Sequence, residues 1–211
     1  NGVGGGILVN GGTVYLGATV SLDNSENIVA TAVNNPVSVT TTGTENHGWN
    51  GKDFPTADGE PRNNWDYKVT KTGGGAVKVV NGQLTVYGGS YTSSQGNGIA
   101  IQQTTDGTAT ATVYGGTFSG DDVYSVNSQN SFFYTGPGAS YAFKVLGGTL
   151  TIFDGIFTSN DGGAFVMNGT AKMYGGIIAA QGATAFVTYT NATVTFDPTT
   201  ELTVDGVPLT G

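Results

Sequence analysis

The sequence predicts an all-β protein whose chain consists of stacked repeats, and three observations support this prediction. First, Gly occupies 36 of the 211 positions and only 10% of the residues are charged, which favours short strands joined by tight turns. Second, no stretch of about 12 residues or more carries a convincing helical period of apolar residues. Third, one short motif, apolar-Thr-apolar-aromatic-Gly-Gly, recurs along the chain.

The repeats are defined by two columns of similar residues. The first column is the aromatic position of the motif, occupied by Tyr87, Tyr114, Tyr134, Phe153 and Tyr174, and Asp197 continues it after Tyr174. Its intervals run from 19 to 27 residues, with a mean of 22. The second column contains apolar tetrapeptides that precede the motif, such as AVKV at 76–79 and AFKV at 142–145. Self-similarity at this period is typical of a solenoid, in which each repeat buries its apolar face only by stacking on its neighbours.

Alternation predicts three short strands in each repeat and assigns a direction to each side chain. In the first strand, Phe143 and Val145 of one repeat and Phe165 and Met167 of the next are expected to point inward. Lys78 and Lys144 share an outward column, where solvation is the expected state of both amines. A Gly pair between the second and third strands makes a sharp corner at little steric cost. Five Thr residues form a second outward column beside the aromatic one: Thr13, Thr85, Thr112, Thr151 and Thr195.

Stacking of the repeats pairs each strand in parallel with its counterpart one repeat away, about 4.8 Å along the axis. Because parallel crossovers are nearly always right-handed, the prediction is a right-handed parallel β-helix of about seven to eight coils. The whole chain, 1–211, is expected to form a single domain. It contains N-terminal coils in 1–42, an irregular loop insertion in 43–72 and regular coils in 73–207.

The repeat architecture in 1–42 and 76–207 resembles that of the right-handed parallel β-helix, or pectin-lyase-like, superfamily. In character it is closest to the non-catalytic solenoids of surface adhesins and fibres. The resemblance implies a stacked-coil fold, and many members cleave or bind polysaccharides. Gly120-Asp121-Asp122 resembles the paired aspartates of polygalacturonases, and His47-Gly48 resembles their histidine motif. However, His47 precedes the aspartates and the chain lacks an Arg-x-Lys segment, so we predict no catalytic residue.

The insertion at 43–72 has a different composition from the repeats. It contains both tryptophans, Trp49 and Trp65, together with the only histidine, His47, and the only arginine, Arg62. Irregular segments of this length in compact proteins are usually either functional or disordered, and the tryptophans favour an ordered loop that binds a partner. The predicted binding residues are therefore His47, Trp49, Arg62 and Trp65 of the loop and Tyr87, Tyr114, Tyr134, Phe153 and Tyr174 of the aromatic column.

Bulk composition argues against several classes of function. A net charge of −8 with a single arginine argues against nucleic acid as a partner. No apolar run approaches the ~20 residues of a membrane-spanning helix. One histidine and no cysteine offer little to a metal ion, and no metal or cofactor is predicted. The low charge and the abundance of Thr and Asn favour an extracellular or cell-surface location. Asn168 and Asn191 each begin a glycosylation sequon.

Three functions remain open at this point. The first is a non-catalytic extracellular structural or adhesive module, which follows from regular repeats without converging acid and base residues. The second is a protein that binds or cleaves carbohydrate with the 43–72 loop and the aromatic column. The third is an ice-binding solenoid that uses the Thr column. The expected partners are a polysaccharide or another cell-surface glycan, and further copies of the chain that associate through coil ends or faces.

Overall fold

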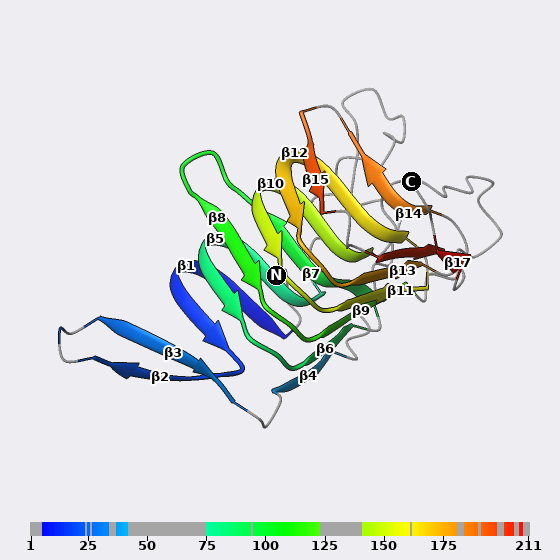
Figure 1. Ribbon diagram of the computed structural model, residues 1–211. Helices are drawn as coiled ribbons and strands as arrows, with labels where there is room; N and C mark the ends of the chain where they lie inside the picture. Colours follow the sequence, from blue (N-terminus) through cyan, green and yellow to red (C-terminus); the bar gives the residue numbers. More distant parts are fainter. Residues whose placement is uncertain are drawn as a thin grey trace, which may run out of the picture.

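The computed structural model describes residues 6–23, 25, 27–33, 37–41, 75–93, 95–122, 141–160, 162–180, 184–189, 191–197, 201–204 and 207–208. All regular elements in these residues are strands (Figure 1). They are β1 (Ile7–Leu16), β2 (Ala18–Leu22), β3 (Ile28–Ala32), β4 (Ser38–Thr41), β5 (Gly75–Val86), β6 (Ser90–Ser93), β7 (Gln95–Gln102), β8 (Ala109–Val113), β9 (Thr117–Asp122), β10 (Tyr141–Ile152), β11 (Ile156–Ser159), β12 (Gly162–Met173), β13 (Ile177–Ala180), β14 (Thr184–Thr188), β15 (Thr193–Phe196), β16 (Glu201–Val204) and β17 (Val207–Pro208). The predicted loop insertion at 43–72 lies outside the described residues.

Most strands pair in parallel with a strand one repeat away, and they form two ladders. In the first ladder β1 pairs with β5, β5 with β7 and β8, these two with β10, and β10 with β12, which pairs with β14 and β15. In the second ladder the order is β4, β6, β9, β11, β13 and β16. Figure 1 shows these strands side by side in sequence order, from blue to orange. The predicted all-β, mostly parallel fold is confirmed.

Four repeats contain one long strand where the sequence predicts two short ones. β1, β5, β10 and β12 each continue through the expected turn between the first and second strands. Residues with positive φ lie inside these long strands: Gly82 has a φ of 91°, Gly147 one of 86° and Asn168 one of 52°. Gly and Asn tolerate this backbone region better than other residues do. These residues therefore lie within single strands, at points where the ladder pairing is interrupted or passes to another partner strand, as from β7 to β8 beside β5.

The core consists of inward columns of equivalent residues from successive repeats. Tyr91, Phe118 and Phe157 are fully buried and stack on one another, with ring centroids 4.9 and 5.0 Å apart. Phe143, which belongs to the first ladder, packs edge-on against Phe157, with the two ring centroids 5.6 Å apart. The Tyr91 hydroxyl donates a hydrogen bond to the Gly88 carbonyl oxygen at 2.9 Å, and burial raises the pKa of Tyr91 to about 12. Aromatic packing thus joins the two ladders across the interior.

The predicted direction of Phe165 and Met167 is wrong by one residue. Phe143 pairs with Ala164 and Val145 with Val166, so Ala164 and Val166 belong to the inward column. Phe165 instead pairs with Lys144 on the outward side. The matching letters Ala-Phe in the two repeats suggest an offset of 22 residues, whereas the ladder keeps a constant offset of 21 from end to end. A side-chain period of two makes such a one-residue error reverse the face.

The corner of the repeated motif depends on its second glycine. Gly89, Gly116, Gly155 and Gly176 occupy this position with φ values of 122°, 120°, 139° and 94°. The carbonyl oxygens of the first three accept backbone hydrogen bonds from the next repeat: Thr117 N donates to Gly89 O at 2.8 Å, Ile156 N to Gly116 O at 2.9 Å and Ile177 N to Gly155 O at 2.8 Å. A Cβ added at Gly116 meets Gly89 O at 3.0 Å. The first glycine is less restricted in most repeats, since Asp154 occupies that position in one of them and open space surrounds a Cβ added at Gly88. Gly175 is the exception, because a Cβ added there meets the Phe153 carbonyl oxygen at 2.6 Å.

We therefore expect Gly116→Ala to lower the free energy of unfolding by about 2 kcal/mol, because the new Cβ is strained by both its φ and the carbonyl oxygen beneath it. Gly88→Ala, one position earlier in a neighbouring corner, should change the free energy by less than about 0.5 kcal/mol. Urea unfolding of the two variants and the wild type measures both effects. Equal stability of the two variants would contradict the role of the second glycine.

Candidate functional site

The outward face of β5, β8, β10, β12 and β15 carries two columns of mainly Thr residues. Parallel pairing aligns the first column as Gln83, Thr110, Thr149, Thr170 and Thr193, and the second as Thr85, Thr112, Thr151, Lys172 and Thr195. At the β1 end, Thr13 and Tyr15 continue these columns. Successive rows lie about 4.8 Å apart, and the two residues of a row about 6.7 Å apart along the strand. The sequence predicted one Thr column and missed the column at 110, 149, 170 and 193. It also placed Thr13 with Thr85, which is wrong, because Thr13 pairs with Gln83 in the missed column and Tyr15 pairs with Thr85.

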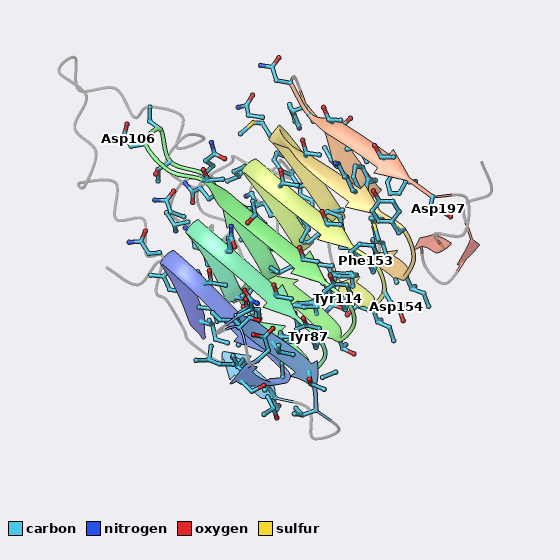
Figure 2. The ribbon with its side chains drawn as sticks, turned by 60° about the vertical axis from the view of Figure 1, so that its left-hand side comes forward. Tyr87, Asp106, Tyr114, Phe153, Asp154 and Asp197 are labelled. Carbon is cyan, nitrogen blue, oxygen red and sulfur yellow. The ribbon has the colours of Figure 1, made fainter. Side chains whose placement is uncertain are left out.

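Four of the five predicted aromatic residues form a continuous stack beside the Thr columns. The sequence predicted the fifth, Tyr134, between Tyr114 and Phe153, but these two rings stack directly on each other and the column has no position between them. Ring centroids are 5.2 Å apart for Tyr87 and Tyr114, 5.0 Å for Tyr114 and Phe153, and 5.1 Å for Phe153 and Tyr174, with interplanar angles of 17°, 6° and 15°. Figure 2 shows Tyr87, Tyr114 and Phe153 in a row along one edge of the molecule. Each backbone N–H donates to the previous repeat, as Tyr114 N does to Val86 O at 2.8 Å. The strand ladder therefore sets the spacing of the rings.

The stacking determines which part of each ring a partner can contact. Tyr114 and Phe153 have an aromatic neighbour on both faces, yet they are 46% and 43% exposed. What they expose is consequently the ring edge, together with the Tyr hydroxyl. Stacking on a sugar ring needs a free aromatic face, so the two inner rings are poorly placed for that mode of binding. Ring-on-ring packing, worth about 0.5–1.5 kcal/mol for each pair, accounts for the recurrence of the aromatic residue.

The other predicted site residues are not placed by the structure. His47, Trp49, Arg62, Trp65 and Tyr134 lie outside the described residues. Their role in binding stays a prediction.

The aspartate pair that resembles that of polygalacturonases lies at the end of β9. The backbone of Asp121 pairs with Gly96, and that of Asp122 with Gln95, in a short antiparallel contact between β9 and β7. Both residues are thus the last two of a strand.

Lys78 and Lys144 are buried, and the expectation that both amines are solvated is wrong. Their side chains are 2% and 1% exposed, and Ala100 separates them in the outward column of the first ladder. Lys144 Nζ lies 5.3 Å from the ring centroid of Phe165 and 5.8 Å from that of Tyr141. Alternation predicted their direction correctly, but direction alone does not reveal that a side chain is covered.

Burial, with a smaller contribution from the charge of Lys78, lowers the pKa of Lys144 to about 8. Burial also lowers the pKa of Lys78. Within the described part of the chain, Lys144 Nζ has no hydrogen-bond acceptor. Aromatic faces attract an ammonium group, and so Phe165 and Tyr141 offset part of the cost of removing this charge from water.

The two sequon asparagines lie one repeat apart. Asn168 and Asn191 both have positive φ, 52° and 62°, and both are exposed. Asn191 Nδ2 donates a hydrogen bond to Asn168 Oδ1 at 3.4 Å. The side-chain amides of both sequons are thus accessible from solvent.

Over the described ranges of the chain no group of three or more His, Cys, Asp and Glu side chains is close enough together to hold a metal ion. The same part of the chain contains no helix of sufficient length and apolarity to cross a membrane.

Comparison with protein-family models, curated proteins and solved structures finds no match to this chain. Functional inference therefore depends on the chain's own features: the Thr columns, the aromatic stack and the buried lysines. Of these, the Thr columns form a regular, partly exposed surface, and we call the surface at 83–85, 110–112, 149–151, 170–172 and 193–195 the Thr face.

Lys144→Met should raise the free energy of unfolding by about 3 kcal/mol at pH 7, because it removes a buried amine while keeping an apolar side chain of similar length. In the wild type the folded state binds fewer protons than the unfolded state between pH 8 and 10.5. Wild-type stability should therefore rise with pH across this window, and the variant should show a smaller rise. The nearby titratable groups from the described strands are Lys78 and Tyr141, and Lys144→Met retains both of them.

Urea unfolding between pH 7 and pH 10 measures this difference, with Lys172→Met as the control at an exposed position of the Thr face. The control should stay within about 0.5 kcal/mol of the wild type at each pH. A destabilised Lys144→Met, or one with the wild-type pH dependence, would show that the amine is paired and charged in the folded protein.

Proposed function

We propose that this chain is a non-catalytic, extracellular structural and adhesive module folded as a right-handed parallel β-helix. The described strands form six rungs in each ladder, where the sequence predicted seven to eight coils, because β7 and β8 pair directly with β10 and β9 pairs directly with β11. The parallel pairings of the two ladders support the coil architecture, since most of them join residues about one repeat apart. The exceptions span chain segments that are absent from the ladders, as where Phe143 pairs with Ile99. The right hand follows from the strong preference of parallel crossovers. The low content of charged residues and the abundance of Thr and Asn support an extracellular location.

The observation that carries the adhesive function is the Thr face. Its hydroxyl groups repeat with the strand spacing across five strands, from β5 to β15. A Thr hydroxyl both donates and accepts hydrogen bonds, as do the hydroxyl groups of a polysaccharide. A flat surface that repeats along the axis suits an extended partner with its own repeat, and an insoluble polysaccharide is such a partner. The aromatic stack borders this face with ring edges and Tyr hydroxyls.

The test is co-sedimentation of the protein with insoluble polysaccharides such as cellulose, chitin and xylan. Thr112→Arg combined with Thr151→Arg places bulk and charge at the centre of the Thr face, and it should reduce binding at least 10-fold. Ser119→Arg combined with Thr158→Arg, on the outward side of the second ladder, is the matched control and should bind as the wild type does. Binding by neither wild type nor control, or equal loss in both double variants, would exclude the Thr face as the adhesive surface.

Two further measurements separate this proposal from the carbohydrate-directed alternatives. Replacing 44–71 by a short Gly-Ser linker should leave polysaccharide binding intact if the Thr face is the adhesive surface. Loss of binding in a folded linker variant would instead assign the activity to the loop and its tryptophans. Release of reducing ends or unsaturated products from pectin or alginate by the wild type would establish an enzyme.

Ice is a second candidate partner for the same face. Complete Thr-x-Thr rows occur at 110–112, 149–151 and 193–195, and such a regular hydroxyl array suits a crystalline surface. Gln83 and Lys172 interrupt the array, which makes ice the weaker candidate. Thermal hysteresis of the wild type, lost in the Thr112→Arg and Thr151→Arg double variant, would favour ice over polysaccharide.

A further inference from the structure

A two-stranded hairpin, β2 and β3, forms a sheet separate from the two ladders. It lies between β1 and β4 in the chain, and Figure 1 shows it extending away from the stacked strands at the N-terminal end. Its base is closed by a hydrogen bond from Val33 N to Gly17 O at 3.0 Å. At its tip, Asp23 Oδ1 accepts hydrogen bonds from Asn27 N at 2.9 Å and Ser25 N at 2.8 Å. Both ends of the hairpin are therefore defined by local hydrogen bonds.

One face of the hairpin is entirely apolar. Residues directly opposite each other in an antiparallel pair lie on the same face, and the pairs on this face are Ala18 with Ala32, Val20 with Ala30, and Leu22 with Ile28. The other face carries Thr19 with Thr31 and Ser21 with Val29. On the apolar face, Leu22 is 65% exposed, Ile28 57% and Val20 48%. We call this surface the hairpin face.

An isolated two-stranded hairpin is marginally stable in water unless a hydrophobic face is covered. In the described structure, β2 and β3 pair with each other and with no other strand. A contiguous exposed apolar surface of this kind commonly marks an interaction site. The remaining question is which partner fits it.

We propose that the hairpin face binds the hairpin face of a second copy of this chain, related by a two-fold axis and with the hairpins antiparallel. Side-chain size increases along the face, from Ala18 and Ala32 at the base, through Val20 and Ala30, to Leu22 and Ile28 at the tip. An antiparallel arrangement sets the large tip of each copy over the small base of the other, and large against small residues interdigitate. A parallel arrangement sets tip on tip and leaves a gap between the bases.

Charge supports the same arrangement. Neither β2 nor β3 contains a charged residue, so two identical faces meet without like-charge repulsion. The tip carries Asp23, whose pKa is lowered by the hydrogen bonds from Asn27 and Ser25, so its carboxylate stays charged. In the antiparallel dimer the two Asp23 carboxylates lie at opposite ends of the interface. An isologous contact of this kind closes on itself as a dimer and does not propagate.

Sedimentation equilibrium across a range of protein concentrations tests for the dimer. The wild type should show a reversible monomer–dimer equilibrium, and Leu22→Lys should raise its dissociation constant at least 10-fold. Ser21→Lys, one residue earlier and on the opposite face, is the matched control and should dimerise like the wild type. A wild type that stays monomeric throughout, larger oligomers, or equal weakening in both variants would overturn the proposal.

Cross-linking tests the antiparallel geometry, because the chain has no cysteine. Oxidation of a mixture of Leu22→Cys and Ala18→Cys chains by dissolved oxygen should form mainly mixed disulfide dimers, because the two-fold axis places the tip of β2 over the base of β2 in the other copy. Val20→Cys, near the two-fold axis, should form homodimers, and Ser21→Cys should not. Predominant Leu22–Leu22 disulfides would show a parallel arrangement and contradict the proposed dimer. Unchanged circular dichroism spectra confirm that each variant is folded.

Discussion

Parallel pairing of equivalent strands in successive repeats is the constraint on which the rest of this structure depends. Between β10 and β12 the backbone hydrogen bonds hold one offset from Tyr141 to Ile152, so equivalent side chains must stack directly on one another. Apolar residues on the inner side then form continuous columns, as Tyr91, Phe118 and Phe157 do. On the outer side the same stacking aligns Thr hydroxyls and aromatic rings. The proposed adhesive surface is therefore a direct consequence of the backbone pairing.

The features that repeat are those that the sequence predicts well. The stack of Tyr87, Tyr114, Phe153 and Tyr174 follows from one recurring motif, and the structure places these four rings in contact. The corner at the second glycine repeats for the same reason, since the carbonyl oxygen of each of the first three of these glycines accepts a hydrogen bond from the repeat above it. In a stacked fold each repeat has the same backbone conformation and the same neighbours, and the residue type that suits a given position therefore recurs in every repeat.

The sequence predictions fail in two situations. In the first, similar residues in two repeats are not the ones that the backbone pairing aligns. In the second, the direction of a side chain is correct but does not determine whether the side chain is buried. Phe165 follows an Ala, as Phe143 does, and the sequence therefore suggests that the two Phe residues are equivalent. The ladder instead aligns Phe165 with Lys144. Lys144 points outward as predicted, yet it is 1% exposed, and no periodic pattern contains information on what covers an outward face. The hairpin face was missed for a related reason: β2 and β3 interrupt the repeat, and their alternation is visible only once their antiparallel register is known.

The most direct test of the stacked architecture is the distance between two spin labels placed at either end of the Thr face. Thr85 and Thr195 lie in the same column, four strand spacings apart through Thr112, Thr151 and Lys172. Labels attached to Thr85→Cys and Thr195→Cys should give one narrow distance distribution in electron paramagnetic resonance. Its centre should correspond to a backbone separation of roughly 19 Å once the length of the label linkers is taken into account. A broad distribution, or one centred beyond about 30 Å, would contradict in-register stacking of the repeats.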